Sequence, residues 1–300
     1  MKFNRSKTTF GRHETFPLRY GWLSKGFAAL CATPRLFSQP DEAMMTLGVG
    51  RNMVNAIEYW LRAIGLIELD GSGAAQPTAL GDILLGAQGD PYLEDEATLW
   101  LIHWLIASST EQATGFYWFF NHFALPRFQE QDALNALNTF VERELRVHRA
   151  QTTLKSDLST LLRMYAPLAG RTDEHLDSPL AQLRLIEVTA GREYRSPRLS
   201  RPFLPPMALH FALAQRFAAD RAQAALPIRA LLYGGDDWAA PGPVFRLSED
   251  GLMQALGQVM ERYPACYALR ESAGLHQVYW QGGRCDPLDL LRDHYRSIAA

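Results

Sequence analysis

Several features that would assign a chemistry at once are scarce in this sequence. The 300 residues include three cysteines, Cys31, Cys266 and Cys285, which lie far apart and outside any CxxC or Cys/His cluster. We therefore expect neither a disulfide framework nor a zinc site, which fits a reducing cytoplasm. The formal net charge is −2, with 21% charged residues, so disorder and a wholly basic surface are both excluded. Any nucleic-acid surface must be local.

Long hydrophobic runs are missing as well. The N-terminal stretch MKFNRSKTTFGRHETF lacks the apolar run of a signal peptide, and the most apolar segment, TLWLIHWLIASS, is too short to span a bilayer. We expect a soluble, cytoplasmic protein without a membrane partner. With 47% apolar residues, the chain can bury a substantial core, and its length favours two domains.

Signatures of catalysis are also lacking. The sequence contains no GxxxxGK[ST] phosphate loop, no GxSxG elbow, no HExxH helix and no glycine-rich dinucleotide fingerprint after a strand. The carboxylates Asp236 and Asp237 lie in a loop-like YGGDDW segment. We expect no enzyme activity, no catalytic residues, no metal ligands and no cofactor. A metal-dependent nuclease assembled from scattered acids is the weaker alternative.

The stretch from Thr46 to Gly81 is informative. Val54, Ile57, Leu61 and Ile64 recur at helical spacing, which predicts one buried helix face. A glycine at the helix end, the short strand LIEL, the turn DGSG and a return strand around 76–78 predict a hairpin after it. Upstream, QPDEAMMTLGVG predicts a short helix with Asp41 as N-cap candidate, then a tight turn. This order is typical of a winged helix-turn-helix.

In such modules the second helix can enter the major groove. The residue types opposite the apolar stripe suit guanine and adenine edges, and the predicted DNA-binding positions here are Arg51, Asn52, Asn55 and Arg62. Glu58 argues against this, because a carboxylate near phosphates is repelled. A protein-docking role for the same module stays open.

Basic residues are concentrated before this module. From Met1 to Arg35 the chain has seven cations and Glu14 as the one acid, a balance of 7 − 1 = +6. Such an arm can hold the phosphate backbone, and we include in the DNA-binding set Lys2, Arg5, Lys7, Arg12, Arg19 and Lys25. The aromatic residues of HETFPLRYGW can stack on bases or anchor the arm to the core, and the two roles are compatible.

A second helix-then-hairpin pattern follows in DEHLDSPLAQLRLIEVTAGREYRSPRLS, with Asp177 as the expected N-cap. We predict a second winged-helix-like module whose basic residues add a further DNA contact through Arg192, Arg195 and Arg198. The segment from Glu94 to Glu96 is expected to be a helix start rather than a metal site. Phe116–Phe120 is expected to be core, or a partner-facing surface.

The segments HETFPLRYGWLSKG, LGVGRNMVNAIEYWLRAIGLIE, PTALGDILLG, DPYLEDEATLWLIHW, TLKSDL, LDSPLAQLRLI and ESAGL together resemble the bacterial domain-of-unknown-function family 4007 over nearly the whole chain. The resemblance implies a protein encoded beside a reductase-like protein of the phosphoadenosine-phosphosulfate type, in DNA-sulfur-modification or phage-defence loci. It implies no catalytic residues, because none is established for the family.

The sequence therefore predicts a mainly α fold with small β-hairpins, arranged as a basic arm plus winged helix-turn-helix (1–110), a helical connector (111–166) and a C-terminal α+β winged-helix-like domain (167–300). We expect a non-catalytic DNA-binding subunit of a DNA-modification or anti-phage system, with double-stranded DNA and a reductase-like or ATPase protein as partners. The alternative is a protein-binding adaptor or a transcriptional regulator of such a locus. Oligomeric state stays open.

Overall fold

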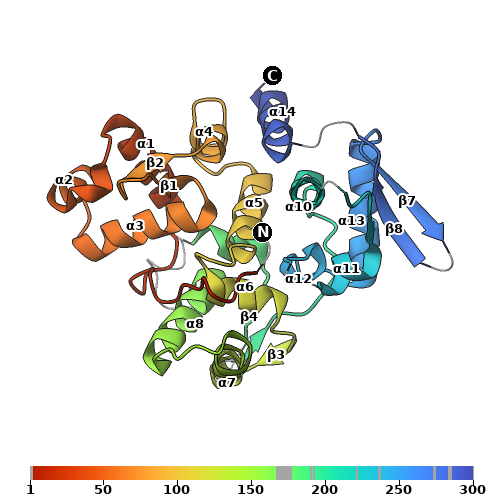
Figure 1. The fold of residues 1–300 in the computed structure, drawn as a ribbon, viewed down its shortest axis with the longest axis horizontal. Helices are drawn as coiled ribbons and strands as arrows, with labels where there is room; N and C mark the ends of the chain where they lie inside the picture. The colour runs from red at the N-terminus through yellow and green to blue at the C-terminus, as the bar shows by residue number, and fades with distance from the viewer. Residues whose placement is uncertain are drawn as a thin grey trace.

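The structure, a computed structural model, describes residues 3–166, 178–189, 191, 193–220, 222–235, 238–272, 275–282 and 286–299. These residues form a mainly helical protein with small antiparallel sheets, as the sequence predicts. Figure 1 shows the N-terminal elements at one end, a central helix, and a C-terminal sheet at the other end. Lys2, Asp177, Arg192, Asp236, Asp237 and Cys285 lie outside the described residues.

The N-terminal elements follow the predicted order. They are α1 (Tyr20–Ala32), η1 (Leu36–Ser38), α2 (Pro40–Leu47), α3 (Arg51–Ile64), β1 (Ile67–Leu69), β2 (Ala75–Pro77) and α4 (Ala79–Leu85). Gly48 ends α2 and Gly65 ends α3, both in the left-handed region (φ 61° and 82°) that favours glycine. The predicted N-cap Asp41 is wrong, because Gln39 takes that position and Pro40 opens the helix.

The middle of the chain surrounds one buried helix. Its elements are α5 (Glu96–Ala107), α6 (Thr114–Asn121), β3 (Arg127–Phe128), α7 (Glu130–Phe140), η2 (Val141–Leu145), α8 (Gln151–Tyr165) and η3 (Pro179–Leu183). Asp95 caps α5 by accepting the Ala97 N–H at 2.9 Å, which confirms the predicted helix start. Residues 97–107 are all buried, and so is Phe116–Phe120, which is core rather than a partner surface.

The C-terminal part combines two small sheets with helices. Its elements are β4 (Glu187–Val188), β5 (Tyr194–Arg195), α10 (Pro206–Ala219), β6 (Ala225–Pro227), α11 (Ile228–Tyr233), α12 (Pro241–Val244), α13 (Glu249–Arg262), β7 (Tyr267–Ser272), β8 (Leu275–Trp280) and α14 (Pro287–Ala299). Strand orders are β3-β5-β4 and β6-β8-β7. The predicted second hairpin exists as β4 and β5, with Glu187 opposite Arg195.

The last helix ties the two ends of the chain together. Helix α14 packs on α4 and α10, the Tyr295 and Thr98 hydroxyls lie 2.8 Å apart, and His294 Nε2 contacts Asp95 Oδ2 at 2.8 Å. One continuous apolar core runs from Phe3 to Tyr295 through all parts of the fold. Within the described residues, no helix is both long enough and apolar enough to cross a membrane.

Candidate nucleic-acid interface

Helix α3 has two distinct faces. Val54, Ile57 and Leu61 are at most 3% exposed, which confirms the predicted apolar stripe. Helix α1 can approach this stripe closely because Gly26 has no side chain; a Cβ there would lie 2.5 Å from Ile57 Cγ2. The close packing of α1 fixes α3 and leaves its opposite face toward solvent.

The start of α3 is the most open part of the predicted DNA-binding face. Arg51, Asn52 and Asn55 are exposed. Arg51 makes an exposed ion pair with Asp41 at 3.5 Å, and such pairs contribute little because water screens them. Lys25 Nζ donates to the Leu47 carbonyl at 2.6 Å, so its charge lies at the turn between α2 and α3. Two cations, Arg51 and Lys25, therefore lie near the start of α3.

The N-terminal arm, residues 3–19, is fixed to the core by a buried pair of side chains. Asp157 Oδ1 accepts the Gly11 N–H at 2.7 Å and lies 2.8 Å from His13 Nε2. His13 Nδ1 accepts the Thr15 N–H at 3.1 Å, so the ring proton is on Nε2 and is donated to Asp157. His13 and Asp157 are 0% and 4% exposed. The arm therefore has one position relative to α3.

Aromatic packing adds to this attachment. The Phe3 ring stacks on Tyr117 at 5.1 Å, and Trp60 Nε1 donates to the Phe16 carbonyl at 3.1 Å. Trp22 is buried, while Phe16 and Tyr20 are partly buried. Of the two interpretations of these aromatics, anchoring to the core is confirmed.

The arm and α3 enclose a surface hollow of about 440 Å³, lined by Thr9, Arg12, Glu14, Asn55, Glu58, Tyr59, Arg62 and Gln112. The structure thus brings together Arg12, Asn55 and Arg62, three residues of the predicted DNA-binding set. Two acids face the two arginines, and burial raises the pKa of Glu58 while Arg62 opposes that shift. The pKa of Glu58 is raised because the effect of burial is larger than the opposing effect of the Arg62 charge.

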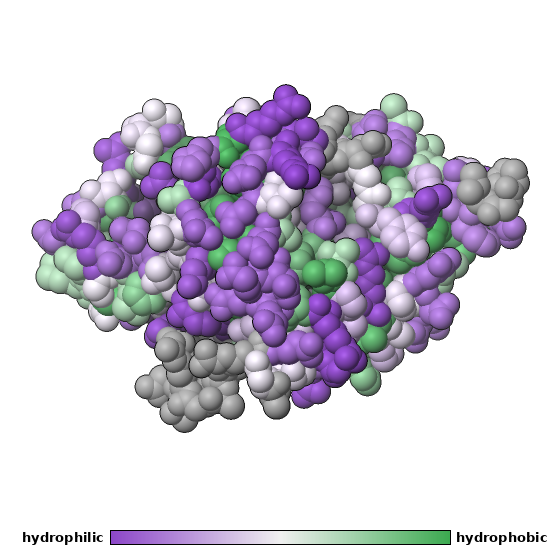
Figure 2. Space-filling model, turned by 90° about the horizontal axis from the view of Figure 1, so that it is seen from below, coloured by the Kyte–Doolittle hydropathy of each residue, from purple (hydrophilic) through white to green (hydrophobic). Residues whose placement is uncertain are grey.

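The other cations of the arm follow its path over the α6–α8 side. Arg5 lies 3.6 Å from Glu144, and Lys7 lies 3.7 Å from Glu111. Arg19 lies over the Trp22 ring at 5.4 Å. The molecular face seen from below, where α7 and α8 lie, is largely hydrophilic (Figure 2). The arm is therefore packed through its rings and hydrated through its cations.

The second predicted anchor is only partly at the surface. Arg195 is half-buried on β5, and its Nε has no hydrogen-bond partner. Arg198 donates to the Leu232 carbonyl at 2.7 Å and lies over the Tyr233 ring at 5.6 Å. Burial lowers the pKa of Arg198. Within the described structure, Arg198 joins the β5 segment to α11.

Two arginines absent from the sequence-based set lie beside Arg198. Arg246 is 2% exposed, and its guanidinium donates to Ser196 Oγ (2.9 Å) and to the Phe119 carbonyl (3.1 Å). Burial lowers its pKa to about 9, with Arg198 and Arg201 adding to the shift. Burial also lowers the pKa of Arg201 to about 10. Sequence alone gives no signal for this cluster, because SPRLSR and PVFRLS look like ordinary surface segments.

The fold is that of a mainly helical protein with small antiparallel sheets, in which α2, α3 and the β1–β2 hairpin lie near a basic N-terminal arm. Residues 10–295 match the family described as "Protein of unknown function (DUF4007)". The chain belongs to that family, which confirms the resemblance seen in the sequence.

Two solved structures share this fold. "Magnesium ion-bound SspB crystal structure" has a TM-score of 0.86 and 28% sequence identity, over 99% of this chain and 91% of that chain. "SspB crystal structure" has a TM-score of 0.85, with the same identity and coverage. Comparison with curated protein sequences finds no match.

Proposed function

We propose that this protein is a non-catalytic, DNA-binding subunit of a bacterial DNA-modification or anti-phage defence system. The family resemblance supports the setting, and the similarity to SspB supports a shared role with that protein. In this proposal α1, α2, α3 and the β1–β2 hairpin act as a winged helix-turn-helix that docks on duplex DNA in the cytoplasm.

The observation that carries the proposal is the open polar start of α3 beside cations. Exposed Asn52, Asn55 and Arg51 can reach base edges, because asparagine suits adenine and arginine suits guanine. Lys25 and Arg12 flank this surface and would face phosphates. The apolar stripe behind it holds the helix in place, so α3 presents these side chains on a rigid element.

Glu14 and Glu58 set a limit on how DNA docks. Both acids line the hollow between the arm and α3, and carboxylates repel phosphates. The duplex backbone would therefore cross near Lys25, the start of α3 and the exposed Arg12, and would avoid the two acids of the hollow. Asn55 stands between these two areas and would mark the edge of the contact.

The alternative is that the same module docks on a protein. Mixed charge in the hollow favours this reading, since a protein surface tolerates it better than a phosphate backbone does. A reductase-like or ATPase protein of the same locus is the proposed partner class. Affinity for duplex DNA, measured against salt concentration, separates the two functions.

One of the two SspB crystal structures is magnesium ion-bound, which raises the question of a metal site in this chain. In the described part of the chain, no three His, Cys, Asp or Glu side chains come together as metal ligands. The described residues therefore do not fit a metal site built from three such protein ligands.

The test mixes the full chain with a supercoiled plasmid, in one sample with Mg²⁺ and in a second sample with EDTA. Binding in both samples without strand breaks supports a non-catalytic DNA-binding subunit. Mg²⁺-dependent conversion to nicked plasmid would overturn the non-catalytic assignment. Absence of duplex binding at low salt would favour the adaptor.

A further inference from the structure

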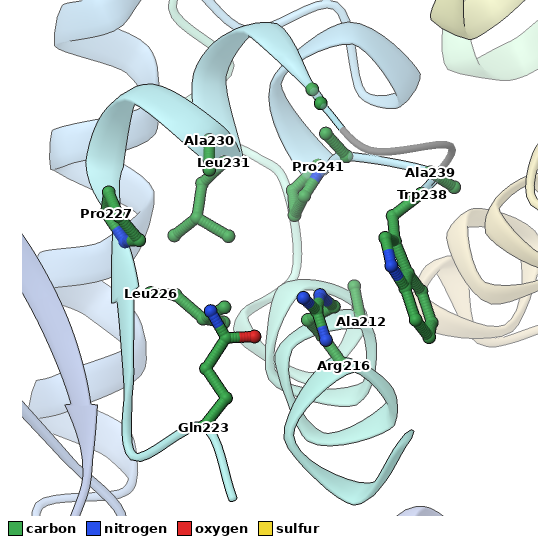
Figure 3. A pocket seen from close by; sticks show the side chains of 13 residues that line it. Ala212, Arg216, Gln223, Leu226, Pro227, Ala230, Leu231, Trp238, Ala239 and Pro241 are labelled. Carbon is green, nitrogen blue, oxygen red and sulfur yellow. The ribbon is translucent and has the colours of Figure 1, made fainter. Parts of the chain in front are cut away.

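A second cavity lies in the C-terminal part, among elements on the opposite side of α5 from α3 (Figure 1). It has a volume of about 180 Å³ and lies between α10, α11 and the segment leading to α12. Figure 3 shows Gln223 and Arg216 reaching into the opening, with Leu226 and Leu231 on one side and Trp238 on the other. Nothing in the proposed DNA contact uses these residues.

Stacking organises one wall of this cavity. The Arg216 guanidinium lies 4.3 Å from the centre of the Trp238 ring, which is cation–π distance. The backbone N–H of Trp238 donates to the Gly235 carbonyl at 3.2 Å. A flat guanidinium backed by an indole is a surface on which planar rings stack well.

An amide provides the hydrogen-bonding group. Gln223 Oε1 is buried and has no hydrogen-bond partner. A buried polar atom without a partner lowers stability, and a ligand with a matching donor would remove that penalty. The glutamine amide pairs a donor with an acceptor, as the edges of nucleobases do.

Size restricts the ligand class. Pockets for drug-sized molecules measure roughly 300–1,000 Å³, so 180 Å³ holds one ring system and no more. Leu226 and Leu231 make the side walls apolar, so Arg216 is the one charged side chain among the lining residues that the structure describes. A single planar heteroaromatic base satisfies the stacking wall, the amide and the volume together.

The mouth of the cavity leads to an open hollow of about 570 Å³. Both spaces share Pro227, Ala230, Gly234 and Gly235, and the outer one adds exposed Arg229. Gly234 at this rim has φ 78° and ψ −175°, a conformation that is essentially open to glycine alone.

We infer that the inner cavity binds one nucleobase and that Arg229 contacts the phosphate of the same nucleotide. The nucleotide is either free or an unstacked unit of single-stranded nucleic acid, since both present the same chemistry. This inference goes beyond duplex binding at α3 and does not depend on it.

The test is calorimetric titration of the full chain with dAMP, deoxyadenosine, inorganic phosphate and a short oligo-dA. Gln223→Ala should weaken dAMP binding roughly tenfold, the equivalent of one lost base contact. Ala230→Leu adds bulk where the two spaces meet, at an exposed helix position where leucine is a good helix former, and should abolish binding. Arg229→Ala should weaken dAMP binding but leave deoxyadenosine binding unchanged.

Matched controls are Gln131→Ala on α7 and Arg143→Ala in η2, both exposed and outside the cavity. They should bind dAMP as the parent does. Binding of dAMP without oligo-dA identifies a free nucleotide, and oligo-dA binding lost in Ala230→Leu identifies a nucleic-acid strand. Failure of both ligands to bind at millimolar concentration overturns the inference. The inference is also overturned if inorganic phosphate binds as tightly as dAMP does. It is overturned as well if the folded Gln223→Ala and Ala230→Leu variants bind dAMP as the parent does.

Duplex affinity measured on the same variants separates this inference from the proposed function. The cavity variants should bind duplex DNA as the parent does, because α3 is untouched. If the parent protein binds duplex DNA but no nucleotide, the cavity inference alone is wrong. If it binds nucleotide but no duplex DNA, the proposed duplex contact at α3 alone is wrong.

Discussion

Asp157 is the side chain that holds the arm beside α3, and its replacement tests whether the arm position matters. Asp157→Ala removes the acceptor for the buried His13 Nε2–H and for the partly buried Gly11 N–H. A buried donor left without a partner costs about 1–3 kcal/mol, so we expect a loss of at least about 1–3 kcal/mol from His13 if the arm stays in place, with a smaller addition from Gly11.

Most of this loss of stability is avoided if the N-terminal arm detaches from the core in the variant. Released into water, Gly11 and His13 regain hydrogen bonds, and the loss is then limited to the contacts of the arm itself, such as the Phe3–Tyr117 stack. We therefore expect the variant to keep the rest of its fold while trypsin cleaves the detached arm after Arg5, Lys7 and Arg12. DNA affinity should fall as well, since Arg12 no longer lies near α3.

The assays are urea unfolding, limited trypsin digestion and duplex binding, with Glu142→Ala in η2 as an exposed acidic control. The control should match the parent in all three. If Asp157→Ala unfolds within about 0.5 kcal/mol of the parent, the range expected of an exposed substitution, and resists trypsin, the reasoning is refuted.

Three further outcomes are expected. Ile57→Ala should lower the free energy of unfolding by about 2–5 kcal/mol, because the side chain is 1% exposed; urea unfolding measures this, and a change below 1 kcal/mol would contradict the packing. Neutralising Lys2, Arg5, Lys7 and Arg12 should reduce the slope of log affinity against log salt by about 0.9 per lost phosphate contact, whereas an unchanged slope would exclude the arm from DNA. Burial lowers the pKa of His103 to about 3 and of His210 to about 4. Below pH 6.5, the usual pKa of histidine, the unfolded chain therefore binds more protons than the folded protein. The free energy of unfolding should consequently decrease as the pH is lowered, by about 2 kcal/mol for each histidine between pH 7 and pH 5. Unfolding at the two pH values in His103→Gln should show a smaller fall than in the parent; an equal fall would contradict this assignment.

Local patterns made much of the fold predictable. The helical spacing of Val54, Ile57 and Leu61 identifies the buried face of α3, and Gly65 marks its end, because both signals lie within a few residues. The caps at Asp95 and Ser248 were predictable for the same reason, since each accepts a backbone N–H two or three positions later.

Long-range contacts were out of reach. His13 and Asp157 are 144 positions apart, and nothing near either residue indicates the other. Arg246 is a similar case, because its partners Phe119 and Ser196 come from distant segments. Helix α14 was missed too, although its return to α4 closes the fold.

The structure brings together only those predicted DNA-binding residues that lie on neighbouring elements. Arg12, Asn55 and Arg62 meet in one hollow because the arm packs along α3. Arg198 was assigned to the surface from the basic run alone, whereas its guanidinium is half-buried against α11. Basic composition predicts charge in a segment, but burial depends on packing that the segment does not encode.

The central claim is that α3 contacts DNA, and one measurement tests it most directly. The duplex affinities of folded Arg51→Ala and Asn55→Ala should be compared with that of the parent protein. Both side chains are exposed, so folding should change by no more than about 0.5 kcal/mol. A lost base-edge contact should weaken binding by roughly 1–3 kcal/mol and relax preference at one base pair, whereas a lost phosphate contact should weaken all sequences equally. If both variants bind duplex DNA as the parent does, α3 does not contact DNA, and the adaptor function takes its place.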